Sequence, residues 1–242
     1  MQELAKRYCE FRDEVFEFLE GGEWREVGEG RMTHDKRVKV GEWKEVVIFG
    51  SNEVKGLDYT KNVLKDVLPE GTVEMCEEGG GEVILSRLGG RARIKKHVGP
   101  SNLRLTCHLG VKVPEGCGIE VAGVEMGWKE GECIVFDDGY EHRVWNDSKE
   151  DRIVLLIRFW NPVVEEGERE GFLEEAKRRK EEDYRERWHP PKEEGEEWIE
   201  GIIEEGRRCA KCGVQGKEEL RIGQGERFEI YCRSCGNIET RD

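Results

Sequence analysis

The chain has 242 residues, of which 36% are hydrophobic and 39% charged, and its formal net charge at pH 7 is −14. This length accommodates one large β domain with a small module attached. Such an acidic balance argues against a general nucleic-acid-binding protein, which would present a basic face. The N-terminus carries charges throughout, and no run approaches the roughly 20 apolar residues that span a bilayer. We therefore expect no membrane span and a cytoplasmic, reducing location.

Apolar residues recur at helical spacing over residues 3–20, which predicts an amphipathic helix, and a second helix is predicted over 59–68. From about residue 82 the apolar period changes to two, with Gly, Pro and Asp turns between short segments. The predicted strands cover residues 82–88, 103–113, 119–124, 133–137, 142–146 and 152–160. This pattern favours a mainly β sandwich or jelly roll over a parallel sheet with crossover helices.

The strand predicted over 103–113 alternates most clearly. One face is uniformly apolar, whereas the other carries Arg104, Thr106 and His108. Such a polar face is typical of solvent exposure and equally of a pocket inside a barrel. The neighbouring histidines favour the pocket.

Residues 163–206 are expected to form a charged helical connector, with a long solvated helix over 166–187 and a short helix around 198–203. The connector is expected to follow an N-terminal domain, residues 1–162, whose jelly-roll core begins near residue 80. It would lead into a small third module, residues 207–242.

That module contains two C-x-x-C pairs, Cys209 with Cys212 and Cys232 with Cys235, and 19 residues separate the pairs. This spacing fits a zinc ribbon with four thiolate ligands, in which Zn(II) is structural because the site is closed. A redox dithiol and two disulfides are the alternatives. Such a module would dock a protein or an RNA partner, and the sequence does not distinguish the two.

Two histidines and an arginine indicate an oxidative metal site. His97 and His142 lie at the ends of separate predicted strands, and Arg152 follows ten residues after His142. Histidine ligands with open coordination positions suit non-haem iron, and a guanidinium binds a carboxylate with two hydrogen bonds. The alternative for Arg152 is an ion pair with Asp147 or Asp151.

These segments resemble the catalytic domain of the aspartyl/asparaginyl β-hydroxylase family, which includes lipid A hydroxylases. The resemblance covers about residues 5–162 and is strongest from 84 to 162. It rests on His97-Val-Gly-Pro-Ser-Asn, Arg104-Leu-x-x-His108-Leu-Gly, Phe136-Asp-Asp-x-x-Glu-His142-x-Val-Trp-Asn, Arg152, and Trp160-Asn-Pro, with Ser86-Arg-Leu and the aromatic Trp43 and Phe49 upstream. It implies a double-stranded β-helix that uses Fe(II), oxygen and 2-oxoglutarate.

The resemblance also implies roles for individual residues. His97 and His142 would bind iron without a ligating carboxylate, since Gly99 stands where most iron oxygenases have Asp or Glu. The co-substrate would be held by a further set of side chains, with Arg152 and Ser86 at its distal carboxylate: Trp43, Ser86, Arg104, His108 and Arg152. The chain departs from the animal enzymes at Thr106, where they carry a second arginine.

The expected activity is therefore hydroxylation of a protein Asp or Asn side chain, or of another β-carbon, with release of succinate and CO2. A peptide or protein substrate is expected first, and a small molecule or lipid second. One alternative is a halogenase-like oxygenase, in which Gly99 leaves room for chloride. The other is a non-catalytic cupin-like binding module, which the joint presence of the site residues disfavours.

Overall fold

The structure is a computed structural model that describes residues 1–27, 38–50, 53–99 and 101–188, and four strands between 199 and 241. The chain divides into two compact units, Met1–Lys177 and Arg178–Asp242. The division falls inside helix α4 (Glu166–Trp188). Among the described residues, no helix combines the length and apolar character that crossing a bilayer requires.

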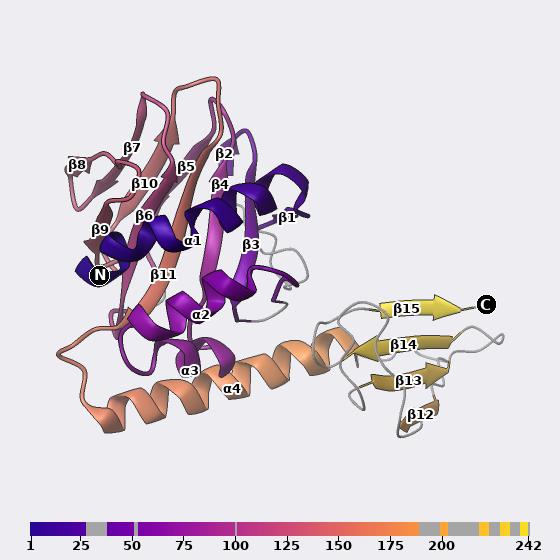
Figure 1. Cartoon of the computed structure of the whole chain (residues 1–242). Coiled ribbons are helices and arrows are strands. Elements are labelled where there is room, and N and C mark those ends of the chain that lie inside the picture. Colours follow the sequence, from indigo (N-terminus) through magenta and orange to yellow (C-terminus); the bar gives the residue numbers. More distant parts are fainter. Residues whose placement is uncertain are drawn as a thin grey trace. The chain divides into compact units, whose positions relative to one another are not determined.

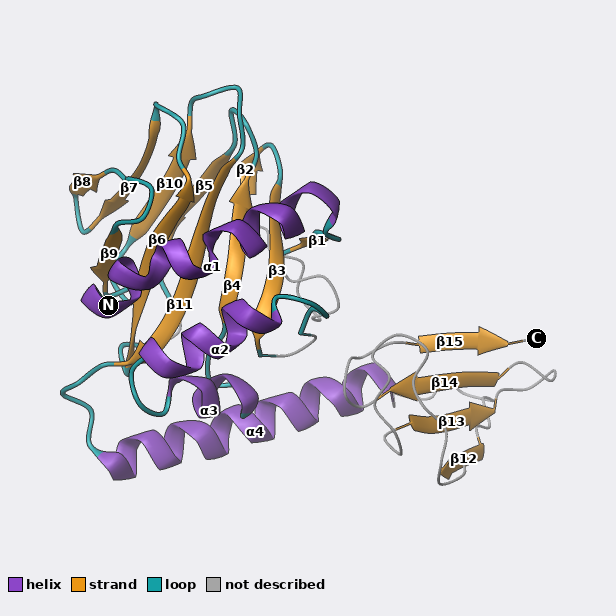
Figure 2. Ribbon diagram, viewed as in Figure 1, coloured by secondary structure: helices purple, strands orange, loops and turns teal. Residues whose placement is uncertain are grey.

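The first unit is built on two antiparallel sheets, as the mainly β prediction requires (Figures 1 and 2). The six-stranded sheet has the order β1 (Arg25–Glu26), β3 (Trp43–Phe49), β4 (Val83–Leu88), β11 (Arg152–Trp160), β6 (Arg104–Lys112) and β9 (Cys133–Phe136). The five-stranded sheet has the order β2 (Val38–Val40), β5 (Arg93–His97), β10 (His142–Asn146), β7 (Cys117–Val121) and β8 (Val124–Met126). The chain passes repeatedly from one sheet to the other, which is the jelly-roll arrangement.

Helices cover the outer face of the six-stranded sheet. Figure 1 shows α1 (Gln2–Gly21) and α2 (Asp58–Val67) lying across β6, β11, β4 and β3, with the short α3 (Thr72–Glu77) below them. Leu4, Phe11 and Val15 of α1 are buried in one cluster with Leu109 of β6 and Leu155 of β11. Burial of this apolar stripe keeps the helix on the sheet.

Strand β11 connects this outer core to the interior. Its odd-numbered residues, Ile153 through Phe159, belong to the cluster under the helices. Its even-numbered residues point the opposite way, and Val154 lies in a second cluster with residues of both sheets. The alternate residues Arg152, Leu156 and Arg158 are therefore directed between the sheets, where a pocket lies.

The first unit extends beyond residue 162, the predicted end of the domain. Phe172 of α4 packs edge-on against Trp160 at the end of β11, with 5.6 Å between ring centroids. Lys177 forms an ion pair with Glu78 at 2.9 Å. The first half of α4 is thus packed against the β domain rather than acting only as a connector.

The second unit contains an antiparallel sheet in the order β12 (Ile199–Ile202), β13 (Glu218–Ile222), β14 (Phe228–Cys232) and β15 (Ile238–Arg241). The short helix predicted around 198–203 is wrong, because Ile199–Ile202 pairs with β13. Cys209, Cys212 and Cys235 lie outside the described residues, as does the side chain of Cys232. The zinc site therefore stays a prediction.

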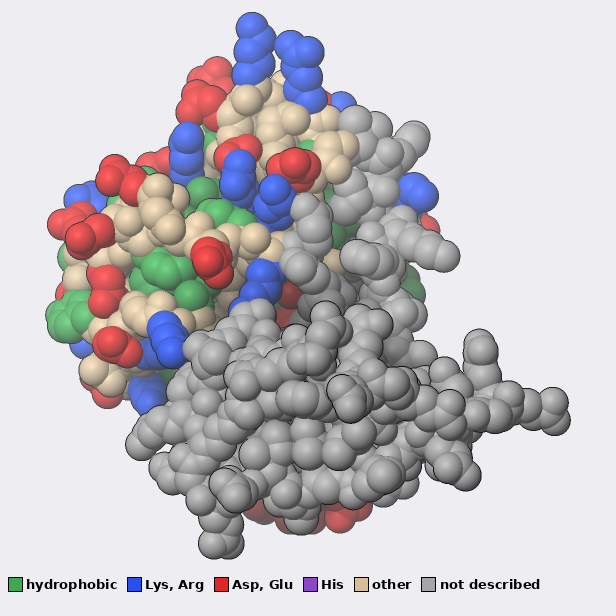
Figure 3. Space-filling model, turned by 90° about the vertical axis from the view of Figure 1, so that its right-hand side faces the viewer, with side chains coloured by type: hydrophobic (Ala, Val, Ile, Leu, Met, Phe, Trp, Pro, Cys, Tyr) green, Lys and Arg blue, Asp and Glu red, His purple; other side chains and the backbone are tan. Residues whose placement is uncertain are grey.

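Acidic and basic side chains are interspersed on the described part of the face that Figure 3 shows. Oppositely charged side chains pair on the surface of the first unit, as Arg143 does with Glu120 and Lys96 with Glu141. On this face the net negative charge is not gathered into one acidic surface.

Candidate active site

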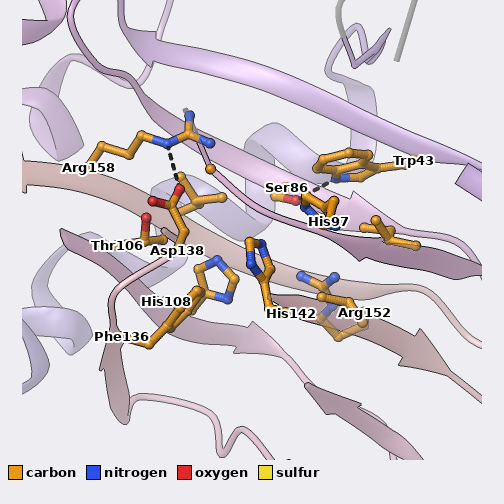
Figure 4. Close-up of a pocket in the computed structure, with 14 residues that line it drawn as sticks. Trp43, Ser86, His97, Thr106, His108, Phe136, Asp138, His142, Arg152 and Arg158 are labelled. Atoms are coloured by element: carbon orange, nitrogen blue, oxygen red, sulfur yellow. Dashed lines mark hydrogen bonds and ion pairs between the residues drawn. The ribbon is translucent and has the colours of Figure 1, made fainter. Parts of the chain in front are cut away.

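A pocket with about 550 Å³ of empty space, counted to its open mouth, lies between the two sheets. The six-stranded sheet and the turn after β9 line one side, and β5 and β10 line the other (Figure 4). The lining residues are Trp43, Ser86, Ile94, His97, Gly99, Thr106, His108, Phe136, Asp138, His142, Val144, Arg152, Leu156 and Arg158. The polar face of β6 thus faces a pocket, which confirms that interpretation of its alternation.

The two predicted metal ligands face each other across neighbouring strands. His97 ends β5, His142 begins β10, and the two residues are register partners. Their rings lie with centroids 4.1 Å apart. The register of one strand pair therefore brings together two residues that are 45 positions apart in the sequence.

Hydrogen bonds to the backbone set the orientation of both rings. Nδ1 of His97 lies 2.7 Å from the carbonyl oxygen of Lys95, and Nδ1 of His142 lies 2.9 Å from that of Tyr140. Since a carbonyl oxygen only accepts, each Nδ1 carries the proton and each Nε2 carries the lone pair. A hydrogen bond from one ring nitrogen to a backbone carbonyl oxygen is typical of metal-binding histidines. The pair therefore fits a metal bound through the two Nε2 atoms.

In the described part of the chain, no group of three or more His, Cys, Asp and Glu residues is arranged to hold a metal. Within these described residues, His97 and His142 are the two side chains that a metal at this position would bind. Its remaining coordination positions would be available for a chelating co-substrate, oxygen or water.

Arg152 is the most unusual charged residue of the pocket. It is 1% exposed, and neither Nε nor Nη1 has a hydrogen-bond partner within the described ranges. Its guanidinium lies over the Trp128 ring, 4.8 Å from the centroid, and burial lowers its pKa to about 10. The carboxylates expected as alternative partners are used elsewhere, since Asp151 pairs with Arg87 and Asp147 with Arg93. A buried, unpaired cation is costly, so the site calls for an anionic ligand.

Ser86 and Trp43 lie at the same end of the pocket as Arg152 (Figure 4). The indole Nε1 of Trp43 donates a hydrogen bond of 3.0 Å to Oγ of Ser86. Accepting this bond leaves the serine hydroxyl hydrogen available for donation to another acceptor. A hydroxyl beside an unpaired guanidinium makes a cradle for one end of a dicarboxylate.

His108 lies deep in the pocket, stacked on Trp128 at 5.8 Å and edge-on to Phe136 at 5.0 Å. Burial, followed by the charges of Arg152 and Arg158, holds its pKa well below 6.5. The imidazole is therefore neutral at pH 7. Its Nδ1 is buried and has no hydrogen-bond partner in the described structure, so it has capacity for a ligand.

Arg104 is not brought to the pocket, although it was expected to bind the co-substrate. Its Nη1 donates to the carbonyl oxygen of Gly80, and its guanidinium lies 5.8 Å from the Phe172 ring centroid. The appended helix α4 thus covers this side chain. The structure supports a packing role for Arg104 instead.

Asp138 and Arg158 line the pocket and were given no role from the sequence. Asp138 is 4% exposed, and its Oδ1 has no hydrogen-bond partner among the residues described. A Cβ atom on Gly99 would lie 2.6 Å from this carboxylate. The space beside the Gly99 Cα is therefore occupied by Asp138, and the halogenase-like alternative stays a prediction.

The family model described as aspartyl/asparaginyl beta-hydroxylase matches residues 5–162, about two thirds of the chain. The chain belongs to this family. Mouse aspartate beta-hydroxylase domain-containing protein 2 is 40% identical over 95 residues, which cover 38% of this chain and 28% of that protein. Human aspartyl/asparaginyl beta-hydroxylase is 28% identical over 170 residues, covering 68% of this chain and 21% of that protein. The chain thus matches only about a quarter of the length of these hydroxylase relatives.

Solved structures show a weaker similarity. A prolyl-4-hydroxylase from Pseudomonas putida has a TM-score of 0.39 and 14% identity, covering 66% of this chain and 86% of that one. The cupin domain of Cnp3 from Schizosaccharomyces pombe has a TM-score of 0.37 and 12% identity, covering 63% and 77%. The family assignment therefore rests on sequence, and the description of the site rests on the geometry above.

Proposed function

We propose that this member of the hydroxylase family is an Fe(II)- and 2-oxoglutarate-dependent dioxygenase that hydroxylates a protein Asp or Asn side chain, or another β-carbon. The observation that carries the proposal is the buried, unpaired guanidinium of Arg152 in one pocket with the His97–His142 pair. A dicarboxylate that chelates a metal at one end requires this combination of a cation and a metal site.

The residues present fit both absent groups. Iron would be held by Nε2 of His97 and of His142, as their backbone hydrogen bonds dictate. The distal carboxylate of 2-oxoglutarate would be held by Arg152 and the Ser86 hydroxyl. His108, neutral and buried, would donate its one N–H to the metal-proximal carboxylate. Trp43 would border the co-substrate while it orients Ser86.

Bound iron would supply the reaction with O2, which would oxidise both partners: 2-oxoglutarate would leave as succinate and CO2 with one oxygen atom, and the substrate would take the other as its hydroxyl group. The protein's part is to bind, orient and exclude water. Arg152 and Ser86 fix the direction from which the co-substrate approaches the histidines. Trp43, Phe136 and Leu156 supply apolar walls around the reacting centre.

Anaerobic titration of metal-free protein tests the proposal. Fe(II) followed by 2-oxoglutarate should produce the visible charge-transfer band of chelated iron. His142→Ala should lose Fe(II) binding without unfolding, because a buried ligand is removed but the β10 pairing remains. Arg152→Ala should retain Fe(II) binding and lose the band at co-substrate concentrations that saturate the parent. Equal Fe(II) affinity in His142→Ala would refute the metal assignment.

The same titration tests the alternative that the protein is a non-catalytic, cupin-like binding module. Such a module would be folded but would show no charge-transfer band. In that case the predicted zinc ribbon, with a protein or RNA partner, would become the main indication of function.

A further inference from the structure

The end of the pocket opposite Arg152 carries a second arginine. Arg158 lies six residues further along β11, on the same face of the strand as Arg152. At about 3.3 Å per residue, the two Cα atoms are roughly 20 Å apart. In Figure 4, His142 lies between Arg152 on one side and Arg158 with Asp138 on the other.

This position corresponds to the one departure from the family motif. Thr106 of β6 stands where the animal enzymes have their second arginine, and Arg158 is its register partner on β11. The Thr106 side chain is small and buried, and its hydroxyl has no hydrogen-bond partner in the part of the chain that is described. Thr106 and Arg158 thus line the same part of the pocket from neighbouring strands, and the guanidinium there comes from β11.

Carboxylates hold Arg158 in position. Its Nη1 forms an ion pair with Glu82, and its Nε lies 3.6 Å from Oδ2 of Asp138. The side chains of Arg158 and Glu82 are 16% and 14% exposed, so the pair is little screened by water. A guanidinium has five N–H donors in a rigid fork, so it can contact more than one carboxylate at a time.

We infer that Arg158, together with the Thr106 hydroxyl, binds an anionic group of the primary substrate and so selects a carboxylate over a carboxamide. The inference rests on the proposed function, which places the co-substrate at the Arg152 end and leaves the Arg158 end to the substrate. The other nearby candidate, Arg104, is bound to Gly80 and covered by Phe172. Arg152 and Arg158 are the cationic side chains among the pocket-lining residues described.

The carboxylate of Asp138 makes the inference testable by removal of Arg158. Its buried carboxylate faces the same space, so the preference for an anion depends on Arg158. Without this arginine, Asp138 and Glu82 would repel a carboxylate and accept hydrogen bonds from a carboxamide. Removal of Arg158 should therefore reverse the preference rather than merely weaken binding.

The test uses full-length protein loaded with Mn(II) and 2-oxoglutarate without oxygen, so that no turnover occurs. The probes are N-acetyl-aspartate N-methylamide and N-acetyl-asparagine N-methylamide, which differ in charge but little in shape. Calorimetry should show the aspartate probe binding to the parent at least about tenfold more tightly, as expected for a hydrogen-bonded charge pair. Arg158→Gln should invert this ratio and change 2-oxoglutarate affinity by less than about twofold.

Three variants complete the test. Arg143→Gln, which removes an arginine from a surface ion pair with Glu120, should keep the parent's ratio. Glu82→Gln combined with Arg158→Gln removes both members of the ion pair and should also lose the preference for aspartate, because Asp138 remains, even if Arg158→Gln alone folds poorly. Thr106→Arg combined with Arg158→Thr moves the guanidinium across the register pair and should restore the preference for aspartate.

A parent that binds both probes equally, or that binds no aspartate probe, would overturn the inference. So would a preference that persists in Arg158→Gln. Failure of Mn(II) or 2-oxoglutarate to bind in the first step would instead overturn the proposed function, and this inference with it.

Discussion

Replacing Arg152 with methionine should stabilise the ligand-free protein while abolishing co-substrate binding. The guanidinium is 1% exposed without a carboxylate partner, and burial lowers its pKa from 12.5 to about 10. At roughly 1.4 kcal/mol per pKa unit, burying the charged form costs about 3 kcal/mol. Methionine avoids this cost and loses the desolvated contact with Trp128, worth about 2 kcal/mol. The free energy of unfolding should therefore rise by about 1 kcal/mol.

Urea denaturation of metal-free protein, followed by tryptophan fluorescence, measures this change. The matched control is Arg143→Met, whose exposed ion pair should contribute less than about 1 kcal/mol. Addition of 2-oxoglutarate with Mn(II), at 100 times its dissociation constant, should stabilise the parent by about 2.7 kcal/mol and leave Arg152→Met unchanged. Destabilisation of Arg152→Met by 1 kcal/mol or more, or intact co-substrate binding, would refute the interpretation of this arginine as an unpaired anion receptor.

Three further predictions concern pH, packing and zinc. Because the pKa of His108 is held well below 6.5 in the folded state, only the unfolded chain takes up this proton as the pH falls below 6.5. Stability should then drop by up to about 1.4 kcal/mol per pH unit, and His108→Gln should reduce the slope of stability against pH measured by urea denaturation. Gly99→Ala should lower the free energy of unfolding by about 1–3 kcal/mol, because the added methyl group would contact Asp138. Asp138→Gly in the same chain should recover this loss. If the losses of the two single variants were instead additive in the double variant, the contact would be contradicted. Chelation or Cys232→Ser should increase hydrogen exchange in residues 207–242 and leave 2-oxoglutarate binding intact, whereas loss of that binding would show that the modules are coupled.

Strands with strong alternation could be predicted from the sequence. The predictions for β10 and β11 match the structure at both ends, because β10 alternates between buried and more exposed residues, β11 is a short apolar run, and turn residues bound both. Strand β5 could be predicted only from the expectation that His97 ends a strand and not from alternation, since Ile94 is its one buried residue and charged residues surround it. Ile199–Ile202 was assigned to a helix because a short apolar segment fits either period, and only pairing with β13 decides.

The site could be predicted from the sequence where a residue type at a given position has one common function. Paired histidines and an arginine at a strand start indicated the pocket, and the structure brings His97, His142, Arg152, Ser86, Trp43 and His108 together around it. Arg104 could not be assigned correctly, because its contact with Phe172 comes from outside the family domain. Arg158 had a detectable signal, since it shares the even-numbered face of β11 with Arg152. Asp138 had none, because it lies in a turn whose approach to Gly99 depends on tertiary structure.

Strand β11 is hydrogen-bonded along both edges, to β4 and to β6. A strand that is paired on both sides cannot stretch or slide, so the distance between Arg152 and Arg158 along the strand is fixed. Substitutions at positions between them, for example at Leu156, can change the shape of the pocket without changing this distance. Deleting one residue between the two arginines would turn Arg158 toward the helices and leave Arg152 in place. The side chains at the Arg152 end and at the Arg158 end of the pocket can therefore change during evolution, whereas the distance between the two ends cannot.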